Sequence, residues 1–154
     1  MQSGRRTFLH TEVTTFPTAE WLARQITETF PWETTTKYLL RDNDGAYGRV
    51  FRRRLFAMGI RDRPTTPHSP WQNGHVERLI GSIKRECLDH VIILDAAHLR
   101  GVLNAYADYY NNDRTHLALD KDTPNSRAIE SEGAIISRPV LGGLHHRYER
   151  KLPE

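Results

Sequence analysis

Two kinds of segment alternate along the chain, and their order restricts the fold more than any other feature. Runs rich in β-branched and apolar residues, which predict strands, are followed by segments whose apolar residues recur at helical spacing. The expected strands are residues 6–14, 37–41 and 60–63, and the expected helices are residues 18–30, 47–58, 70–88 and 95–111. Strands and helices in this order predict an α/β fold.

Local signals mark the ends of these elements. Thr18 is expected to cap the first helix, and Pro31 is expected to stop it, because proline lacks the amide that a continuing helix requires. Gly59 is expected to end the second helix. The strand of residues 37–41 is expected to be buried and to run directly into Asp42.

The composition is that of an ordinary globular protein. The 154 residues, of which 38% are hydrophobic and 27% charged, suffice for one domain with a hydrophobic core. No apolar run approaches the roughly 20 residues of a membrane span, and the N-terminus has no secretory signal. The single cysteine, Cys87, excludes an internal disulfide and indicates a reducing cytoplasm. The net charge of +3 favours a polyanionic partner such as DNA, although many proteins without such a partner share it.

Asp42 is a candidate metal ligand because it closes a strand. Ligands of α/β proteins usually bind where strands end at their carboxyl side. Asp44 stands two residues further on, within a stretch of Asp, Asn and Gly residues. These residue types also favour turns for backbone reasons, so a simple turn is the alternative.

Glu77 shares one face of its expected helix with other polar residues. At about 100° per residue, Asn73, Gly81 and Lys84 fall within about 40° of Glu77. The expected core stripe of this helix consists of Val76, Ile80, Ile83 and Cys87. Glu77 then lies at the edge of the core, where a carboxylate beside a glycine and a lysine suits a metal site that DNA approaches closely. The alternative is an amphipathic helix whose polar face contains a glutamate.

Three motifs follow one another in order. Asp42 stands five residues before the aromatic Tyr47, and Glu77 follows Asp42 at 35 positions within the motif of residues 69–78. The third motif consists of Tyr109, Tyr110, Asn111, Arg114, His116 and Leu119. Together they resemble the second-aspartate motif, the glutamate motif and the C-terminal signature of DDE-type bacterial insertion-sequence transposases and retroviral-type integrases. The resemblance extends over about residues 5–150.

The resemblance implies a ribonuclease-H-like integrase core in which two Asp and one Glu bind two Mg²⁺ or Mn²⁺ ions. One ion activates water or a DNA 3′-hydroxyl, and the other stabilises the leaving oxygen. Asp42, and not Asp44, is then one catalytic metal ligand, and Glu77 is another. The residues that the resemblance implies in DNA contacts are Gln72, Asn73, Arg78, Lys84, Arg85 and Arg114.

The sequence departs from the family at its start. Residues 6–14 resemble the third strand of the fold, so the first two strands and the first aspartate have no counterpart here. An incomplete core over residues 5–120 is therefore expected, with a long C-terminal helix, and then a loosely packed basic extension over residues 121–154. Residues 6–14 should either pair directly with residues 37–41 or leave both edges unpaired. Asp42 and Glu77 should lie within about 10 Å of each other.

The expected function is DNA transposition or integration, with transposon ends and target DNA as partners. A homo-oligomer or a full-length transposase is the expected protein partner, with no membrane, in the bacterial cytoplasm at the nucleoid. The alternatives are a non-catalytic DNA-binding or subunit-interaction module that inhibits transposition, and a pseudogene remnant. One basic cluster is either a solvated helix face or a set of DNA phosphate contacts: Arg49, Arg52, Arg53, Arg54, Arg61 and Arg63. A second cluster either binds DNA or is a disordered end of the chain: Arg138, His145, His146, Arg147, Arg150 and Lys151.

Overall fold

The computed structural model describes residues 1–2, 4–30, 36–67 and 69–152. They form two compact units, one of residues 14–79 and one of residues 1–13 together with 80–154. Both helices and strands are present, so the α/β class is confirmed. No helix in the described ranges is long and apolar enough to cross a membrane.

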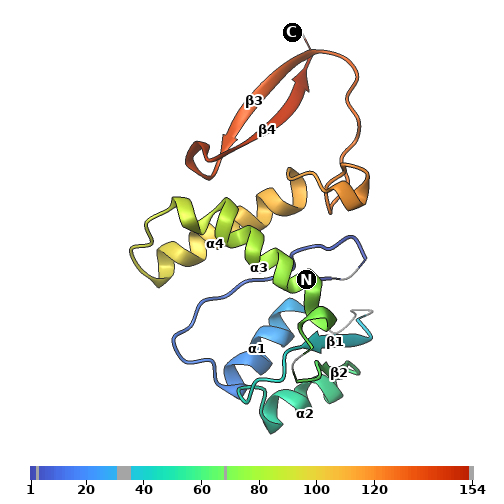
Figure 1. The fold of residues 1–154 in the computed structure, drawn as a ribbon, viewed down its shortest axis with the longest axis vertical. Helices are drawn as coiled ribbons and strands as arrows, with labels where there is room; N and C mark the ends of the chain where they lie inside the picture. Colours follow the sequence, from blue (N-terminus) through green and yellow to red (C-terminus); the bar gives the residue numbers. More distant parts are fainter. Residues whose placement is uncertain (3, 31–35, 68, 153–154) are drawn as a thin grey trace. The chain divides into compact units, whose positions relative to one another are not determined.

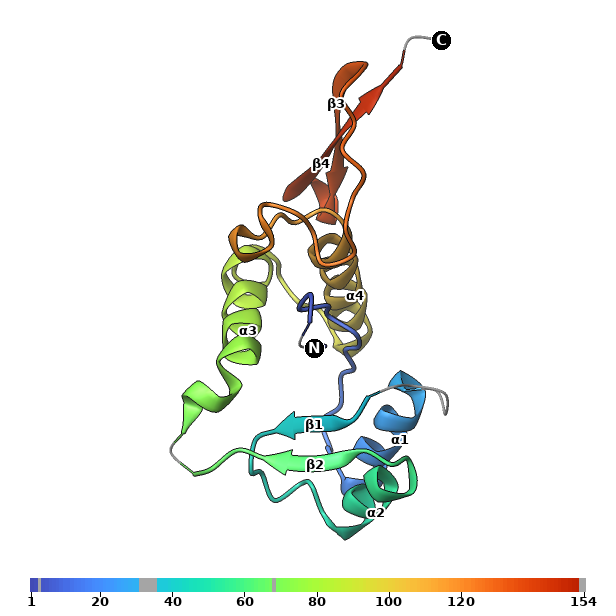
Figure 2. The same ribbon diagram turned by 90° about the vertical axis from the view of Figure 1, so that its right-hand side faces the viewer.

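The unit of residues 14–79 is a small parallel sheet with two helices. Strand β1 (Tyr38–Arg41) pairs in parallel with β2 (Arg61–Pro64), with Tyr38 opposite Arg61 and Arg41 opposite Pro64. Helix α1 (Ala19–Thr29) precedes β1, and α2 (Arg49–Ala57) connects the two strands (Figures 1 and 2). The expected helices and the later two strands are therefore confirmed, with ends shifted by one or two residues.

The core of this unit lies on one face of the sheet. Phe51 and Leu55 of α2 and Ile60 before β2 are buried, and Leu39 of β1 packs against them together with residues of α1. Tyr38 and Leu40 point to the other face and are 52% and 47% exposed. The prediction of a buried strand over residues 37–41 is thus wrong for every second residue, because in the described residues helices cover only one face.

The capping signals in the sequence are confirmed. The Thr18 hydroxyl accepts a hydrogen bond from the backbone amide of Trp21 at 3.2 Å, which caps α1. Gly59 follows α2 with a φ of +69°, a left-handed conformation that glycine adopts without strain. Pro31 lies outside the described residues.

Residues 6–14 do not form the expected strand. The segment is extended, but its backbone is held by a side chain: the amide of Asn111 accepts from Phe8 N and donates to Phe8 O, both at 2.8 Å. Phe8 is buried and meets the ring of Tyr110 edge to face. Within the described residues, β1 pairs only with β2, so residues 6–14 and 37–41 are not paired with each other.

Asn111→Leu should lower the free energy of unfolding by about 2 kcal/mol, since two hydrogen bonds of about 1 kcal/mol each disappear from a buried backbone. Urea unfolding measures the change. Asn104→Leu, at an exposed position of the same helix, is the matched control and should change stability by less than about 0.5 kcal/mol. Equal effects of the two substitutions would show that Asn111 does not anchor the N-terminal segment.

The second unit contains a long helix and a β-hairpin. Helix α4 (Ala96–Asn112) is capped by Asp95, and α3 (Gly74–Glu86) contributes its C-terminal half to this unit. Strands β3 (Ala134–Val140) and β4 (His145–Lys151) pair antiparallel. Short 3-10 turns lie at Pro70–Asn73, Leu88–His90, Leu117–Leu119 and Leu141–Gly143.

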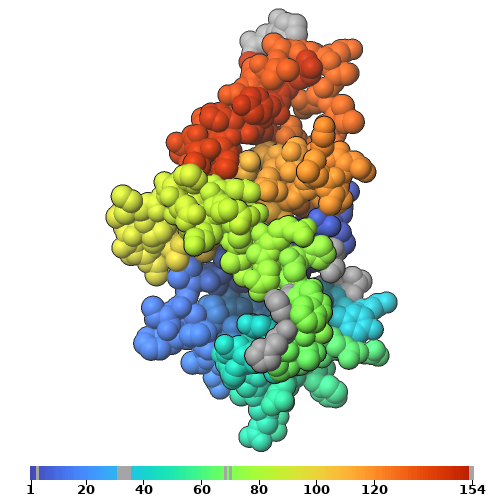
Figure 3. Space-filling model, in the orientation of Figure 1, coloured from blue at the N-terminus to red at the C-terminus, as the bar shows by residue number. Residues whose placement is uncertain are grey.

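The hairpin replaces much of the expected loosely packed extension. His145 stacks on Tyr109 of α4 with ring centroids 4.3 Å apart, and its Nε2 lies 2.7 Å from the Glu86 carbonyl oxygen. Arg147 forms an ion pair with Asp113 at 3.1 Å. In the space-filling view the hairpin (orange to red) lies against the helical part of its own unit (Figure 3). The expected long C-terminal helix corresponds to α4, and the domain boundary after residue 120 stays a prediction.

Candidate functional site

Asp42 lies directly after β1, at the carboxyl end of the two parallel strands, and its side chain is exposed. The turn that the sequence also allowed belongs to its neighbour Asp44. The Asp44 carboxylate accepts the backbone amide of Ala46 at 2.7 Å, and its carbonyl oxygen accepts that of Tyr47. Asp44 therefore stabilises the loop, which supports Asp42 as the candidate ligand.

Tyr47 interacts with the Asp42 carboxylate. Burial raises the pKa of the Tyr47 hydroxyl, and the negative charge of Asp42 and a hydrogen bond to it raise this pKa further. The hydroxyl therefore stays protonated near the Asp42 carboxylate. This contact explains in physical terms why the spacing of five residues between the acid and the aromatic residue is useful.

Arg41 is a positioning residue that the sequence reading missed. It is 8% exposed and binds Asp62 through two hydrogen bonds, at 2.9 and 2.8 Å. Its third nitrogen, Nη1, donates to the backbone carbonyl of Asp42 at 2.9 Å, and its guanidinium lies 4.5 Å from the ring centre of Tyr47. The alternation of the strand could have revealed it, because Arg41 shares the core-facing side with Leu39.

Glu77 lies in the first turn of α3 and is exposed. The buried residues of this helix and its end are Leu79, Ser82 and Cys87, while Ile80 is 55% exposed. On a helical wheel, Leu79 and Ser82 fall about 160° and 140° from Glu77. The prediction that Ile80 lies in the core and Glu77 at its edge is therefore wrong: Glu77 points away from the buried side of the helix.

A complete two-ion site is not assembled by the part of the chain that the structure describes. No three His, Cys, Asp or Glu side chains come together there as metal ligands. Asp42 and Glu77 are both carboxylates, the ligand type that Mg²⁺ and Mn²⁺ prefer, and both belong to the unit of residues 14–79. They can be two ligands of such a site, and their mutual distance stays a prediction.

The residues predicted to contact DNA differ in whether their side chains already form contacts within the protein. The Gln72 side chain accepts the Thr66 amide at 2.8 Å and thereby ties the loop before α3. Asn73 is half-buried, whereas the side chains of Arg78, Lys84 and Arg85 on α3 are exposed. Exposed cations on the helix of Glu77 are available to phosphate groups.

Arg114 is largely engaged within the protein. Its Nε and Nη2 donate to the Glu86 carboxylate at 2.7 and 2.6 Å, and Tyr106 donates to the same carboxylate at 2.9 Å. Burial alone would raise the pKa of Glu86, but the hydrogen bonds from Arg114 and Tyr106 lower it. These bonds fix the end of α3 to α4 and the residues that follow it, and the DNA contact of Arg114 stays a prediction.

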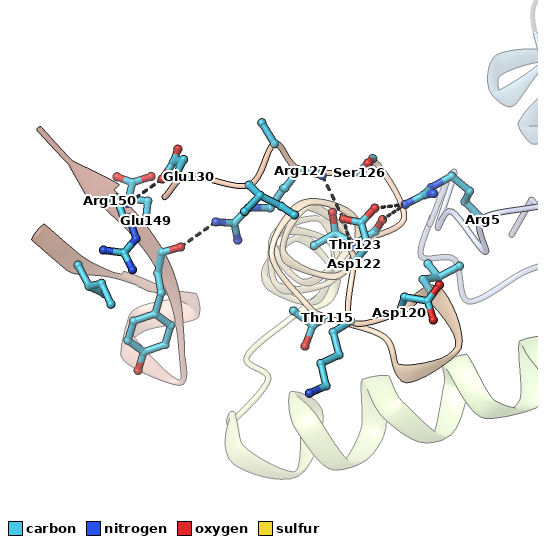
Figure 4. Close-up of a pocket in the computed structure, with 16 residues that line it drawn as sticks. Arg5, Thr115, Asp120, Asp122, Thr123, Ser126, Arg127, Glu130, Glu149 and Arg150 are labelled. Atoms are coloured by element: carbon cyan, nitrogen blue, oxygen red, sulfur yellow. Dashed lines mark hydrogen bonds and ion pairs between the residues drawn. The ribbon is translucent and has the colours of Figure 1, made fainter. Parts of the chain in front are cut away.

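A pocket of about 700 Å³ lies in the second unit, between the loop after α4 and the hairpin (Figure 4). Its charged lining residues are Arg5, Lys121, Arg127 and Arg150, and Asp120, Asp122, Glu130 and Glu149. Arg5 binds Asp122, and Arg127 Nη2 donates to the Tyr148 carbonyl at 2.7 Å. Hydrogen bonds, first from the backbone amide of Arg127, hold the pKa of Asp122 below its usual range. Positive and negative groups balance here, so the pocket is a poor site for a polyanion.

Comparisons with known proteins agree with the motifs. Residues 58–124, which include Glu77, match the model of the integrase core domain. The insertion element IS407 uncharacterized 31.7 kDa protein of Burkholderia multivorans is 32% identical over 75 residues, which are 49% of this chain and 27% of that protein. The chain thus spans about a quarter of this relative's length.

A solved structure shares the fold. It is a chain from the simian T-cell lymphotropic virus intasome in complex with the PP2A regulatory subunit B56 gamma. The match has a TM-score of 0.56 at 17% identity and covers 88% of this chain and 53% of that chain. The integrase resemblance is therefore confirmed by a family model, a curated relative and a fold.

Proposed function

We propose that this chain is part of a protein that cleaves DNA and transfers DNA strands during transposition or integration. The reason is that residues 58–124 match the model of the integrase core domain. The observation that carries the proposal is the position of Asp42. It lies at the carboxyl end of two parallel strands, and its negative charge acts on the nearby Tyr47 hydroxyl. Glu77, in the first turn of α3, follows Asp42 by 35 residues. Asp42 and Glu77 are the proposed catalytic carboxylates.

Asp42 and Glu77 would hold Mg²⁺ or Mn²⁺ together with a third carboxylate. Divalent ions in such sites supply activation of the attacking oxygen and stabilisation of the leaving oxygen. Because the described residues bring no third ligand together, the chain by itself is proposed to be inactive in catalysis. The same observation favours a second candidate function, a non-catalytic module that binds DNA or a transposase subunit.

The proposed partners are transposon-end and target DNA, together with further copies of the chain or a longer transposase. Arg78, Lys84 and Arg85 are proposed to contact phosphate groups, since all three are exposed on the helix that carries Glu77. Gln72 and Asn73 are proposed to approach the DNA end. The proposed location is the nucleoid of a bacterial cell, because the proposed partner is DNA and the relative described above is bacterial.

Lys84→Ala should weaken binding to all DNA duplexes about equally. Each lost phosphate contact removes about one unit from the slope of log affinity against log salt, so this slope should flatten by about one. Fluorescence anisotropy with labelled duplexes of different sequence over a salt series measures both quantities. Lys121→Ala removes an equally exposed lysine that lies outside α3 and should leave the slope unchanged. Salt-insensitive binding, or strong preference for one sequence, would contradict the proposed electrostatic contact.

A further inference from the structure

The face of the β1–β2 sheet that faces away from α1 and α2 has an unusual set of side chains. Because paired residues of neighbouring strands point to the same side, Tyr38 and Leu40 share this face with Arg61 and Arg63. All four side chains are exposed. Arg52 and Phe56 of α2 do not lie on this side of the sheet, but they line a groove together with Arg61 and Arg63. We name these two residues and the four of the sheet the arginine face.

Two arginines gather around one aromatic ring on the arginine face. The guanidinium carbons of Arg61 and Arg63 lie 5.7 and 5.6 Å from the ring centre of Tyr38. Cation–π contacts of this kind orient the guanidinium groups but do not neutralise them. The ring itself remains half open, with Tyr38 52% exposed.

A groove extends the arginine face towards α2. It has a volume of about 560 Å³ and is lined by Arg52, Phe56, Ile60, Arg61 and Arg63, among others. Phe56 is 87% exposed, so a second ring is open to a ligand. The one carboxylate that lines the groove, Asp62, is already bound through both oxygens by Arg41.

The positive charge of the arginine face is therefore uncompensated. Arg52, Arg61 and Arg63 form no ion pair with any carboxylate in the described ranges. Like charges that are crowded on one surface repel each other, and a bound polyanion removes this repulsion. Exposed aromatic rings lie among these charges. A partner that uses the whole surface must therefore also have flat groups that can stack on the rings.

We propose that the arginine face binds single-stranded DNA, with phosphates on Arg52, Arg61 and Arg63 and bases stacked on Tyr38 and Phe56. Aromatic rings interleaved with cations suit unpaired strands, whose bases are open to stacking. A duplex offers the same phosphates but keeps its bases stacked inside. An acidic peptide matches the charge but makes no use of the rings.

The arginine face also leads to the proposed catalytic carboxylate. Arg63 is paired with Leu40, two residues before Asp42, so a strand on this face would run towards the end of β1. This last step rests on the proposed function. The binding itself does not, because it needs neither Asp42 nor Glu77 nor a metal ion.

The test compares four labelled probes on the whole chain in EDTA: a mixed-sequence single strand, its duplex, an abasic strand of equal length and polyglutamate. The single strand should bind more tightly than the other three. Tyr38→Leu and Phe56→Leu should each weaken single-strand binding by about fivefold or more without changing the salt slope. Arg52→Gln should flatten that slope by about 0.7 units, the value for one phosphate of a single strand.

Control variants outside the arginine face test whether the loss of any exposed ring or charge weakens single-strand binding. Phe16→Leu removes another exposed ring of the same unit, and Arg53→Gln removes the neighbouring exposed charge of α2 outside the groove; neither should alter single-strand binding. Equal affinity for normal and abasic strands would overturn the stacking proposal. Binding of polyglutamate as tight as that of DNA would overturn it in favour of an acidic protein partner. Lys84→Ala should weaken duplex binding and keep the single-strand preference, so the two proposals can fail independently.

Discussion

No DNA strand transfer is expected from this chain in Mn²⁺, whereas the same chain preceded by two family strands that carry an aspartate is expected to be active. The physical reason is the ligand count of the proposed site: Asp42 and Glu77 are two carboxylates, whereas the two-ion site that the resemblance implies uses three. Two carboxylates carry less negative charge than three at the point where two ions must be held close to each other. A strand-transfer assay with labelled DNA ends, run on both forms, measures the difference.

Substitutions in the extended form test which carboxylates matter. Asp42→Asn and Glu77→Gln should each lower the rate by at least about 100-fold, since changes in outer-shell partners of metal ligands already cost about 10- to 100-fold. Asp44→Asn is the matched control, because Asp44 bonds the Ala46 amide and an amide oxygen can accept the same bond. Activity in the short form, or dependence on Asp44 in place of Asp42, would refute the assignment.

Local physics in the sequence predicts the helices of this fold well. Helical periodicity and the end signals Thr18 and Gly59 depend only on near neighbours along the chain, and the structure confirms both. The turn at Asp44 is also local, since a side chain that bonds an amide two residues on needs no distant partner. The turn beside the candidate site could therefore be predicted before the fold was known. The choice of Asp42 over Asp44 as metal ligand comes from the family resemblance and stays a prediction.

The parts that depend on distant partners could not be predicted in this way. Residues 6–14 have the composition of a strand, but a strand requires a neighbour, and Phe8 instead finds the side chain of Asn111, 103 positions away. Periodicity on α3 selected Ile80 for the core, whereas burial follows the partners that the helix meets, and Ile80 is exposed. The hairpin strands contain Arg, His and Pro, so their composition does not indicate strands.

Strand alternation, which is local, indicates that Arg41 faces the core, but its partner Asp62 lies 21 positions away and could not be identified in this way. The second large effect concerns this pair. Asp62→Leu should lower the free energy of unfolding by about 3–5 kcal/mol, because it leaves the buried Arg41 guanidinium without its carboxylate. Glu28→Gln, which breaks the exposed ion pair with Arg24, is the control and should cost less than about 1 kcal/mol. Urea unfolding of both variants measures the contrast.

Arg41→Met combined with Asp62→Leu separates stability from positioning. With both charged groups gone, no charge is left buried, so most of the lost stability should return and the double variant should be more stable than Asp62→Leu alone. The hydrogen bond from Arg41 to the Asp42 carbonyl and the cation over Tyr47 are still absent. In the extended form, strand transfer should therefore stay low although the fold is restored. Full activity in the stable double variant would show that the buried pair serves the fold alone and does not position Asp42.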